Sequence, residues 1–186
     1  MNGFLKVIGI VGLPASGKGE FSRIASELHI PVIVMGDIIR AEVIRRCLPQ
    51  TDAYTGHVAN ELRRAEGMDA IARRTIPYLA DLSGPLAIID GIRGDAEVAL
   101  FRRHFPEFIL VGIHSSIAFR AQRLEKRGRA DDPKAVNELS RRDERERAWG
   151  LDTALASADI TLENEGTLED FAREVRILLT RLRDEP

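Results

Sequence analysis

The stretch V-I-G-I-V-G-L-P-A-S-G-K-G-E-F, residues 7–21, constrains the fold more strongly than any other part of the chain. An apolar run rich in β-branched residues leads directly into two glycines that enclose four residues, followed by a lysine and a helical pattern. The segment from Gly12 to Lys18 matches G-x-x-x-x-G-K, in which backbone N–H groups turn inward around a phosphate and the lysine adds a mobile cation. The N-terminus of the following helix adds partial positive charge. The pattern therefore predicts a strand, a phosphate loop and a helix in immediate succession.

Apolar, β-branched runs recur along the chain, and a polar or glycine-containing turn and a longer helical pattern follow each of them. Continuous apolar runs that alternate with helices are typical of a parallel sheet covered on both faces. A chain of 186 residues, 44% of them apolar, can bury the core of one such domain. The expected strands are residues 5–11, 31–35, 86–90, 108–113 and 158–162.

Two intervals are longer than the dozen or so residues that a simple crossover needs, and we expect them to be insertions above the sheet. Residues 38–85 can hold two or three helices, and residues 120–150 are dominated by charge. Residues 120–147 contain ten Lys or Arg and seven Asp or Glu, although the whole chain has a net charge of −2. Such local positive charge indicates a small anionic ligand and argues against general nucleic-acid binding.

Membrane insertion and secretion are not expected. No apolar run approaches the roughly 20 residues that span a bilayer, and the N-terminal F-L-K-V-I-G-I-V-G-L leads into the phosphate loop where a signal peptide would have a cleavage site. The single cysteine, Cys47, excludes an intramolecular disulfide and suits a reducing cytoplasm. We expect Cys47 to be a small buried apolar residue.

The loop G-L-P-A-S-G-K-G-E-F resembles that of adenylate kinases, which also place a glycine after the lysine where most phosphate loops have serine or threonine. Glu20 stands where those kinases have threonine. It could hold Mg²⁺ through water, or it could be a favourable acid in the first helical turn. The resemblance implies that ATP is bound by Gly12, Leu13, Pro14, Ala15, Ser16, Gly17, Lys18, Gly19 and Glu20.

The segment I-V-M-G-D-I-I-R-A-E-V, residues 33–43, resembles the T-G-D-x-L-R segment of adenylate kinases. The resemblance implies that Asp37 caps a helix at the rim of a monophosphate pocket and that Arg40 binds the acceptor phosphate. Arginine suits this role because its planar fork matches a phosphate. The alternative is that Asp37 is an ordinary N-cap and that Arg40 is solvated.

An acid ends the third apolar run in L-A-I-I-D-G-I-R-G-D, residues 86–95. This is the Walker B arrangement, in which Asp90 would hold a water of the Mg²⁺ shell. D-G-I-R also resembles the D-G-F-P-R of these kinases with one residue fewer, which implies that Arg93 is a second phosphate clamp. Asp95 is expected to cap the next helix.

Arginines recur on one face of the charged segment, with Arg120, Arg123 and Arg127 at i, i+3 and i+7, and Arg141 and Arg145 sharing a face further on. Like charges four residues apart on a helix repel by a few tenths of a kcal/mol, and an anionic ligand would offset this. Adenylate kinases surround the transferring phosphoryl group with arginines of their lid. The resemblance implies this role for Arg123, Arg127 and Arg141, with Arg145 as a further candidate. The alternative is a solvated face held by ion pairs.

The closing A-D-I-T-L-E-N-E-G-T-L-E-D-F, residues 158–171, resembles dephospho-CoA kinases at least as much. Over nearly its whole length the chain is similar to archaeal P-loop proteins described as related to adenylate kinase. The resemblance implies one α/β P-loop kinase domain over residues 1–186, with a five-stranded parallel sheet in the order 2-3-1-4-5. Residues 38–85 would be an acceptor-binding helical insertion and residues 120–150 an arginine-rich lid.

The function implied is transfer of the γ-phosphoryl group from ATP and Mg²⁺ to a small phosphorylated acceptor, a nucleoside monophosphate such as AMP. No general base is needed when the acceptor is an ionised phosphate. Two alternatives stay open. A dephospho-CoA-type kinase would phosphorylate a hydroxyl with Asp37 as base, and a nucleotide-dependent switch would bind ATP or AMP, hydrolyse slowly and present partner-binding surface in residues 41–85.

Overall fold

The computed structural model describes residues 5–82, 84–127 and 136–184, except for the side chains of Arg127 and Val136. Its centre is a five-stranded sheet in the order β2-β3-β1-β4-β5, and every neighbouring pair is parallel. The predicted fold class and strand order are therefore confirmed. The strands are β1 (Lys6–Val11), β2 (Val32–Val34), β3 (Leu86–Ile92), β4 (Phe108–His114) and β5 (Ile160–Glu163).

The middle strand, β1, shows why these runs are continuously apolar. Its Val7 and Val11 join the apolar core on one face of the sheet, while Ile8 and Ile10 join the core on the other. Because helices cover both faces of the sheet, side chains that point to either face are buried. Ile8 lies opposite Ile88 of β3 on one side and Ile109 of β4 on the other.

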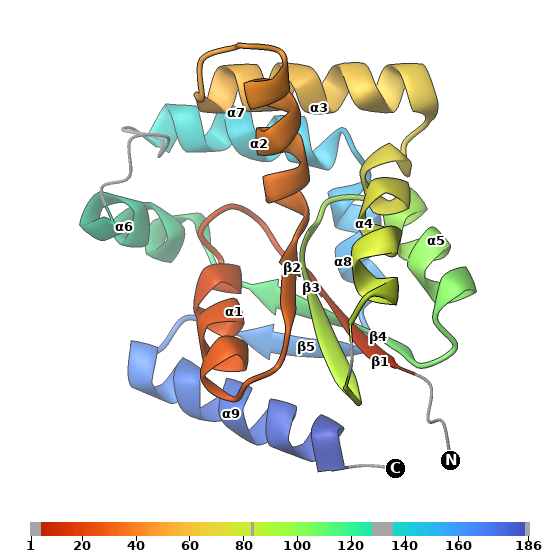
Figure 1. Cartoon of the computed structure of the whole chain (residues 1–186). Coiled ribbons are helices and arrows are strands. Elements are labelled where there is room, and N and C mark those ends of the chain that lie inside the picture. The colour runs from red at the N-terminus through yellow and green to blue at the C-terminus, as the bar shows by residue number, and fades with distance from the viewer. Residues whose placement is uncertain (1–4, 83, 128–135, 185–186) are drawn as a thin grey trace.

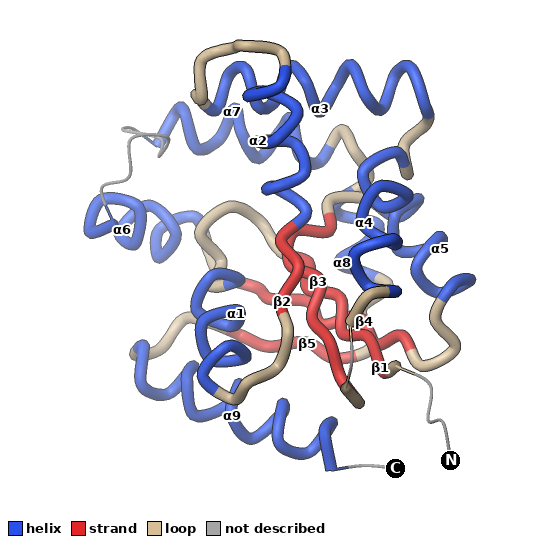
Figure 2. Tube along the Cα trace, viewed as in Figure 1, coloured by secondary structure: helices blue, strands red, loops and turns tan. Residues whose placement is uncertain are grey.

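Helices form a layer on each face of the sheet, as Figures 1 and 2 show. One face is covered by α1 (Lys18–Glu27) and α9 (Leu168–Asp184), and the apolar side chains of both helices share a core with Ile8 and Ile10. The amide of Asp170 donates to Thr167 Oγ1 at 3.1 Å, which caps the start of α9. The other face is covered mainly by α4 (Ala70–Ala80), α5 (Asp95–His104) and α8 (Leu151–Ala156).

The two long intervals form the remaining helices. Residues between β2 and β3 include α2 (Met35–Arg45) and α3 (Asp52–Glu66), and residues between β4 and β5 include α6 (Ile117–Arg127) and α7 (Val136–Arg147). In Figure 1, α2, α3 and α7 lie together at the end of the molecule opposite α9. The loop between β1 and α1 faces this group, so both insertions are placed to contact a ligand of the loop.

Two local predictions were wrong. Cys47 is exposed, because it follows the last turn of α2 in a left-handed conformation with φ 55° and never reaches the buried face of that helix. Asp95 is the first residue of α5 and does not cap it, because the N-cap position is taken by Gly94. In the described part of the chain, no helix is both long enough and apolar enough to cross a membrane.

Candidate active site

The phosphate loop, residues 12–17, is packed so tightly that its glycines cannot be replaced freely. Gly17 has φ 123°, and a Cβ there would lie 2.3 Å from Asn164 Nδ2. A Cβ at Gly12 would lie 2.7 Å from the carbonyl oxygen of Ile113. The hydroxyl oxygen of Ser16 is buried inside the loop and has no hydrogen-bond partner in the part of the chain that the structure describes. The loop thus has the glycine-dependent shape and the unsatisfied polar group that a phosphate ligand would suit.

Lys18 begins α1 and folds back over the loop. Its ammonium group donates to the carbonyl oxygens of Gly12 at 2.6 Å and Leu13 at 2.8 Å, and only 8% of the residue is exposed. Burial, and next the charge of Arg93, lower the pKa of Lys18 to about 7, although Glu146 and Asp90 oppose the shift. Both of its present partners are neutral carbonyls, so a phosphate oxygen would be a stronger partner for this amine.

Asp90 lies on β3, close to its carboxyl end, and faces the loop. Its carboxylate accepts a hydrogen bond of 2.7 Å from the hydroxyl of Ser22, one turn along α1 from Gly19. Among the described residues, no group of three His, Cys, Asp or Glu side chains could hold a metal ion. One carboxylate is nevertheless enough for Mg²⁺, which keeps several waters and binds substrate phosphates.

A cleft of about 570 Å³ opens over the phosphate loop. Basic side chains predominate in its lining, and such a concentration of charge attracts anions. The basic residues that line it are Lys18, Arg23, Arg40, Arg93, Arg123 and Arg142, and the acidic ones are Glu20 and Asp90.

Arg93 is held against the loop by contacts on two sides. Its NH1 group donates to the carbonyl oxygen of Gly12 at 3.3 Å, and its Nε lies 3.2 Å from Oε2 of the buried Glu146. Burial opposes ionisation of Glu146, yet Arg93, Arg142 and Lys18 together hold the pKa of this carboxyl below its usual value. Arg93, predicted as a phosphate clamp, therefore lies between the loop and a buried carboxylate.

Arg123 connects α6 to the loop. It donates to the backbone and side-chain oxygens of Asn164 at 2.6 and 2.9 Å and to Ser115 Oγ at 2.9 Å, and burial lowers its pKa. Arg120 is fully enclosed, with a bidentate ion pair to Asp143 at 2.9 and 2.6 Å and a bond of 3.1 Å to the carbonyl oxygen of Pro14. Of these two lid arginines, Arg123 lines the cleft and Arg120 braces the loop.

Asp37 does not cap a helix, contrary to the prediction from sequence. The chain enters α2 at Met35 directly from β2, with Val34 at the N-cap, so Asp37 lies inside the first turn. It is paired with Arg40, whose Nε donates to Asp37 Oδ1 at 2.9 Å, and 66% of the Asp37 side chain is exposed. Arg40 lines the cleft.

The other predicted residues take different positions. Glu20 lines the cleft and is paired with Arg23 at 2.6 Å. Arg141 is exposed on α7 and is not among the described residues that line the cleft. The side chain of Arg127 lies outside the described part of the structure.

A second, smaller pocket of about 90 Å³ adjoins the cleft between α2, α3 and α7. Of the residues that line this pocket, Arg40, Arg93 and Arg145 were candidate site residues from the sequence. The sequence did contain one sign that Arg63 is a site residue, because this arginine interrupts the apolar face of α3 beside Ala59 and Leu62. The polar residues that line this pocket are Arg40, Asp52, Thr55, Arg63, Arg93, Arg142, Arg145, Glu146 and Trp149.

Trp149 belongs to a cluster of polar residues beside this second pocket. Its indole N–H donates to Asn60 Oδ1 at 2.7 Å, and the guanidinium of Arg63 lies 4.2 Å from its ring centre. Arg63 in turn donates to the buried Glu97 at 2.9 Å, and Glu97 Oε2 accepts the amide of Arg93 at 2.7 Å. Burial raises the pKa of Glu97, against the opposing effect of Arg63. Glu97 thus links the second pocket to the clamp beside the loop.

Comparison with known proteins agrees with this architecture. A family model described as an AAA domain matches residues 11–140. A UPF0200 protein from Methanoculleus marisnigri is 58% identical over 178 residues, which cover 96% of this chain and 97% of that protein. A UPF0200 protein from Methanosarcina acetivorans is 47% identical over 176 residues, or 94% of each chain.

Solved structures share the fold at low sequence identity. Protein TT1252 from Thermus thermophilus has a TM-score of 0.64 at 20% identity, covering 96% of this chain and 98% of that one. Shikimate kinase from Acinetobacter baumannii, solved with shikimate, has a TM-score of 0.57 at 18% identity and covers 97% and 96% of the two chains. At this level of identity the similarity concerns the fold.

Proposed function

The chain belongs to the UPF0200 family and has a P-loop kinase-like fold, and from this premise we propose that it transfers the γ-phosphoryl group of ATP to a nucleoside monophosphate such as AMP. One observation carries the proposal. The phosphate-loop cleft and the smaller pocket adjoin each other and share Gly36, Arg40, Gly91, Arg93 and Arg142 in their linings. Phosphoryl transfer from ATP to an acceptor that is itself a phosphate needs two anion sites in contact, one for the donor and one for the acceptor.

The donor half of the site is built from the loop, Lys18 and Asp90. We expect the loop amides and Lys18 to bind the β- and γ-phosphates, with Asp90 and its partner Ser22 orienting the water shell of Mg²⁺. The orphaned hydroxyl of Ser16 and the glycines of the loop fit a bound phosphate. When bound, the metal ion would neutralise charge on the phosphates.

The acceptor half is built from arginines. Arg40 and Arg93 would bind the acceptor phosphate, and Arg123 and Arg142 would neutralise charge as the phosphoryl group moves between the two sites. Arg127 and Arg141 remain proposed members of this lid. An oxygen of the acceptor phosphate would attack the γ-phosphorus of ATP. The bond between the γ-phosphorus and the β,γ-bridging oxygen would break at the same time, which leaves ADP and a nucleoside diphosphate. An ionised acceptor needs no base.

A hydroxyl acceptor, as in dephospho-CoA-type kinases, would require such a base. Asp37, the candidate from the sequence, is two-thirds exposed and is engaged by Arg40. A slow nucleotide switch would need the donor site alone. The geometry favours the monophosphate acceptor over both, because arginines line the region where the two cavities join.

The proposal is tested by AMP titration with the loop filled by a non-hydrolysable ATP analogue. Arg40→Ala should weaken AMP binding about ten- to a hundredfold, because a charge-assisted contact is lost, and should leave ATP binding unchanged. Arg45→Ala is the matched control, since it removes an exposed arginine of the same helix outside the cleft. Formation of ADP from ATP and Mg²⁺ is measured with and without AMP.

Two results would contradict the proposal. The first is a wild-type protein that binds no AMP beside the ATP analogue, which favours a switch. The second is turnover that AMP does not stimulate but that a hydroxyl acceptor does, which favours the dephospho-CoA-type reaction. Asp37→Asn would then be the more damaging change.

A further inference from the structure

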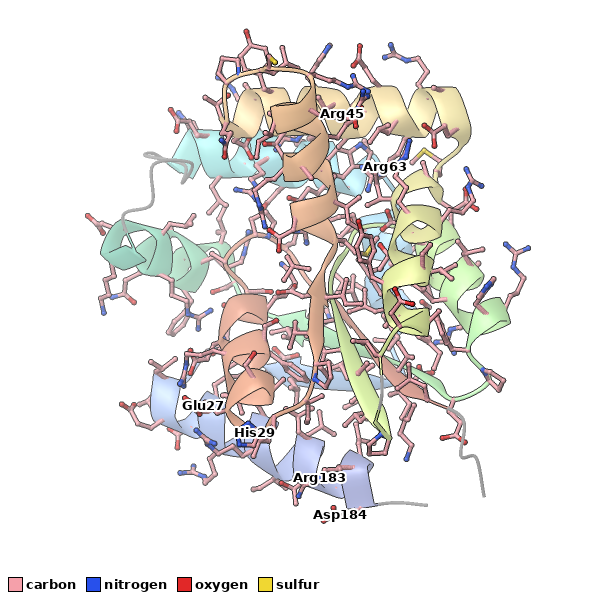
Figure 3. The ribbon with its side chains drawn as sticks, viewed as in Figure 1. Glu27, His29, Arg45, Arg63, Arg183 and Asp184 are labelled. Carbon is pink, nitrogen blue, oxygen red and sulfur yellow. The ribbon has the colours of Figure 1, made fainter. Side chains whose placement is uncertain are left out.

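Two arginines that line the second pocket each have a buried hydrogen-bond donor that no group in the described part of the chain satisfies. Arg63 is only 4% exposed, and its NH1 group has no hydrogen-bond partner among the described residues, although its NH2 group is bonded to Glu97. The Nε of Arg145 is also buried, and no residue that the structure describes bonds to it. Both residues line the pocket, and Figure 3 shows Arg63 below α3, on the side that faces the rest of the molecule. Buried donors of this kind are costly to leave unpaired, so they point to a ligand that accepts hydrogen bonds.

The charge of the pocket indicates that this ligand is an anion. Five arginines line it, against the two carboxylates of Asp52 and Glu146. Arg145 donates to both carboxylate oxygens of Asp52, at 3.0 and 2.8 Å, and Arg142 lies 3.5 Å from the same group. An oxyanion is therefore already present here, supplied by the protein itself. A planar guanidinium fork binds carboxylate and phosphate oxygens alike.

The size of the pocket favours a small ligand over a nucleobase. Its volume of about 90 Å³ is smaller than the roughly 150 Å³ of an apolar cavity that holds benzene, and a purine is larger than benzene. One face of the Trp149 ring is also covered, because the guanidinium of Arg63 lies 4.2 Å from the ring centre, and the guanidinium of Arg145 lies 5.9 Å from it. A single phosphate group is small enough to enter.

We propose that the second pocket binds the phosphate of the acceptor through Arg63 and Arg145, with the rest of the acceptor outside the pocket. This inference rests on the proposed function, since it identifies the site at which that acceptor is held. Arg40 and Arg93 line both cavities and contact the same phosphate from the side of the loop. The carboxylate of Asp52 competes with the ligand for Arg145.

Trp149 provides a direct readout, because it is the single tryptophan of the chain and lies against Arg63. The full-length protein, with the ATP analogue bound, is titrated with AMP, inorganic phosphate or adenosine while Trp149 emission is followed. AMP and inorganic phosphate should change the emission saturably, and adenosine, which lacks the anion, should not. The two phosphate sources are distinguished by their affinities, since AMP adds contacts outside the pocket.

Three variants and a control test the assignment. Arg63→Lys keeps a cation opposite the buried Glu97 but loses the fork, and Arg145→Gln removes the second donor. Each should raise the Kd for AMP and for phosphate about ten- to a hundredfold, with calorimetry as a second measurement. Asp52→Asn should lower the Kd, a gain that structural damage would not produce. Arg64→Gln, at an exposed position of the same helix, should bind as the wild type does.

The outcomes separate this inference from the proposed function. If AMP is phosphorylated normally and binds equally well to Arg63→Lys and Arg145→Gln, the pocket assignment is wrong and the kinase proposal stands. If phosphate binds in a way that depends on Arg63 while AMP neither binds nor stimulates ADP formation, the anion site stands and AMP is not the acceptor. Adenosine that binds as tightly as AMP overturns the assignment.

Discussion

Binding of a nucleoside triphosphate should cause Lys18 to take up a proton. In the free protein, burial and the charge of Arg93 lower the pKa of Lys18 to about 7, against an ordinary value of 10.5. At pH 8 such an amine is only about one-tenth protonated, whereas contact with phosphate oxygens favours the charged form. If binding restores the ordinary pKa, the complex takes up about 0.9 proton at pH 8 and about 0.5 at pH 7.

Calorimetry in two buffers with different ionisation enthalpies measures this uptake directly. The non-hydrolysable ATP analogue is titrated at pH 7 and at pH 8. Its phosphates have a second pKa of about 6, so they contribute little to the proton uptake at pH 8. Lys18→Met keeps a side chain of similar length without the amine and should abolish the uptake as well as weaken binding. Lys126→Met, at an exposed position of α6, is the control and should match the wild type.

A binding enthalpy that is the same in both buffers at pH 8 would refute the reasoning, as would uptake that persists in Lys18→Met. The same lowered pKa has a consequence for the free protein. Between about pH 7 and 10.5 the unfolded chain binds more protons at Lys18 than the folded one does. The contribution of this residue to the free energy of unfolding therefore rises with pH across that window.

Three further variants test other parts of the site. Asp90→Asn should reduce Mg²⁺-dependent turnover about tenfold or more while metal-free nucleotide binding falls less; equal losses would count against its metal role. Gly17→Ala should abolish nucleotide binding and lower the free energy of unfolding by about 1–3 kcal/mol, because φ is 123° and a Cβ would lie 2.3 Å from Asn164 Nδ2; intact binding by calorimetry would contradict this. Asp143→Ala leaves Arg120 buried without its carboxylate and should lower the free energy of unfolding by about 3–5 kcal/mol in denaturant titrations, and a change below 1 kcal/mol would show that the pair is not structural.

The sheet could be predicted because its signal is local. The three central strands, β1, β3 and β4, are largely buried on both faces, so burial appears in the sequence as one unbroken apolar run. The strand expected at 108–113, for example, is Phe108–His114. The loop could be predicted for a related reason, since the positions of Gly12, Gly17 and Lys18 are set by backbone geometry within seven residues. The order of the strands came from the family resemblance.

The acceptor side was harder because its partners are distant in sequence. Asp52 meets Arg145 across 93 residues and Arg63 meets Glu97 across 34, and helical periodicity gives the face of a residue but not what covers it. Asp37 failed as a cap because β2 runs into α2 without a loop, which apolar patterning does not reveal. Cys47 lies just beyond a helix end, where boundaries inferred from sequence are least accurate.

The buried pair of Arg120 and Asp143 limits which parts of the site can move relative to one another. It joins α6 to α7, and through the carbonyl oxygen of Pro14 it joins both to the phosphate loop, so these parts should move as one rigid body. The ion pairs of Asp52 with Arg142 and Arg145, which join α7 to α3, are partly exposed and easier to break. The contact of α7 with Asp52 of α3 should therefore loosen before its contact with the loop, while the buried pair of Arg63 and Glu97 keeps α3 attached to α5. Because mobile ions weaken partly exposed pairs most, admission of the acceptor should become faster as ionic strength increases, even while its affinity declines.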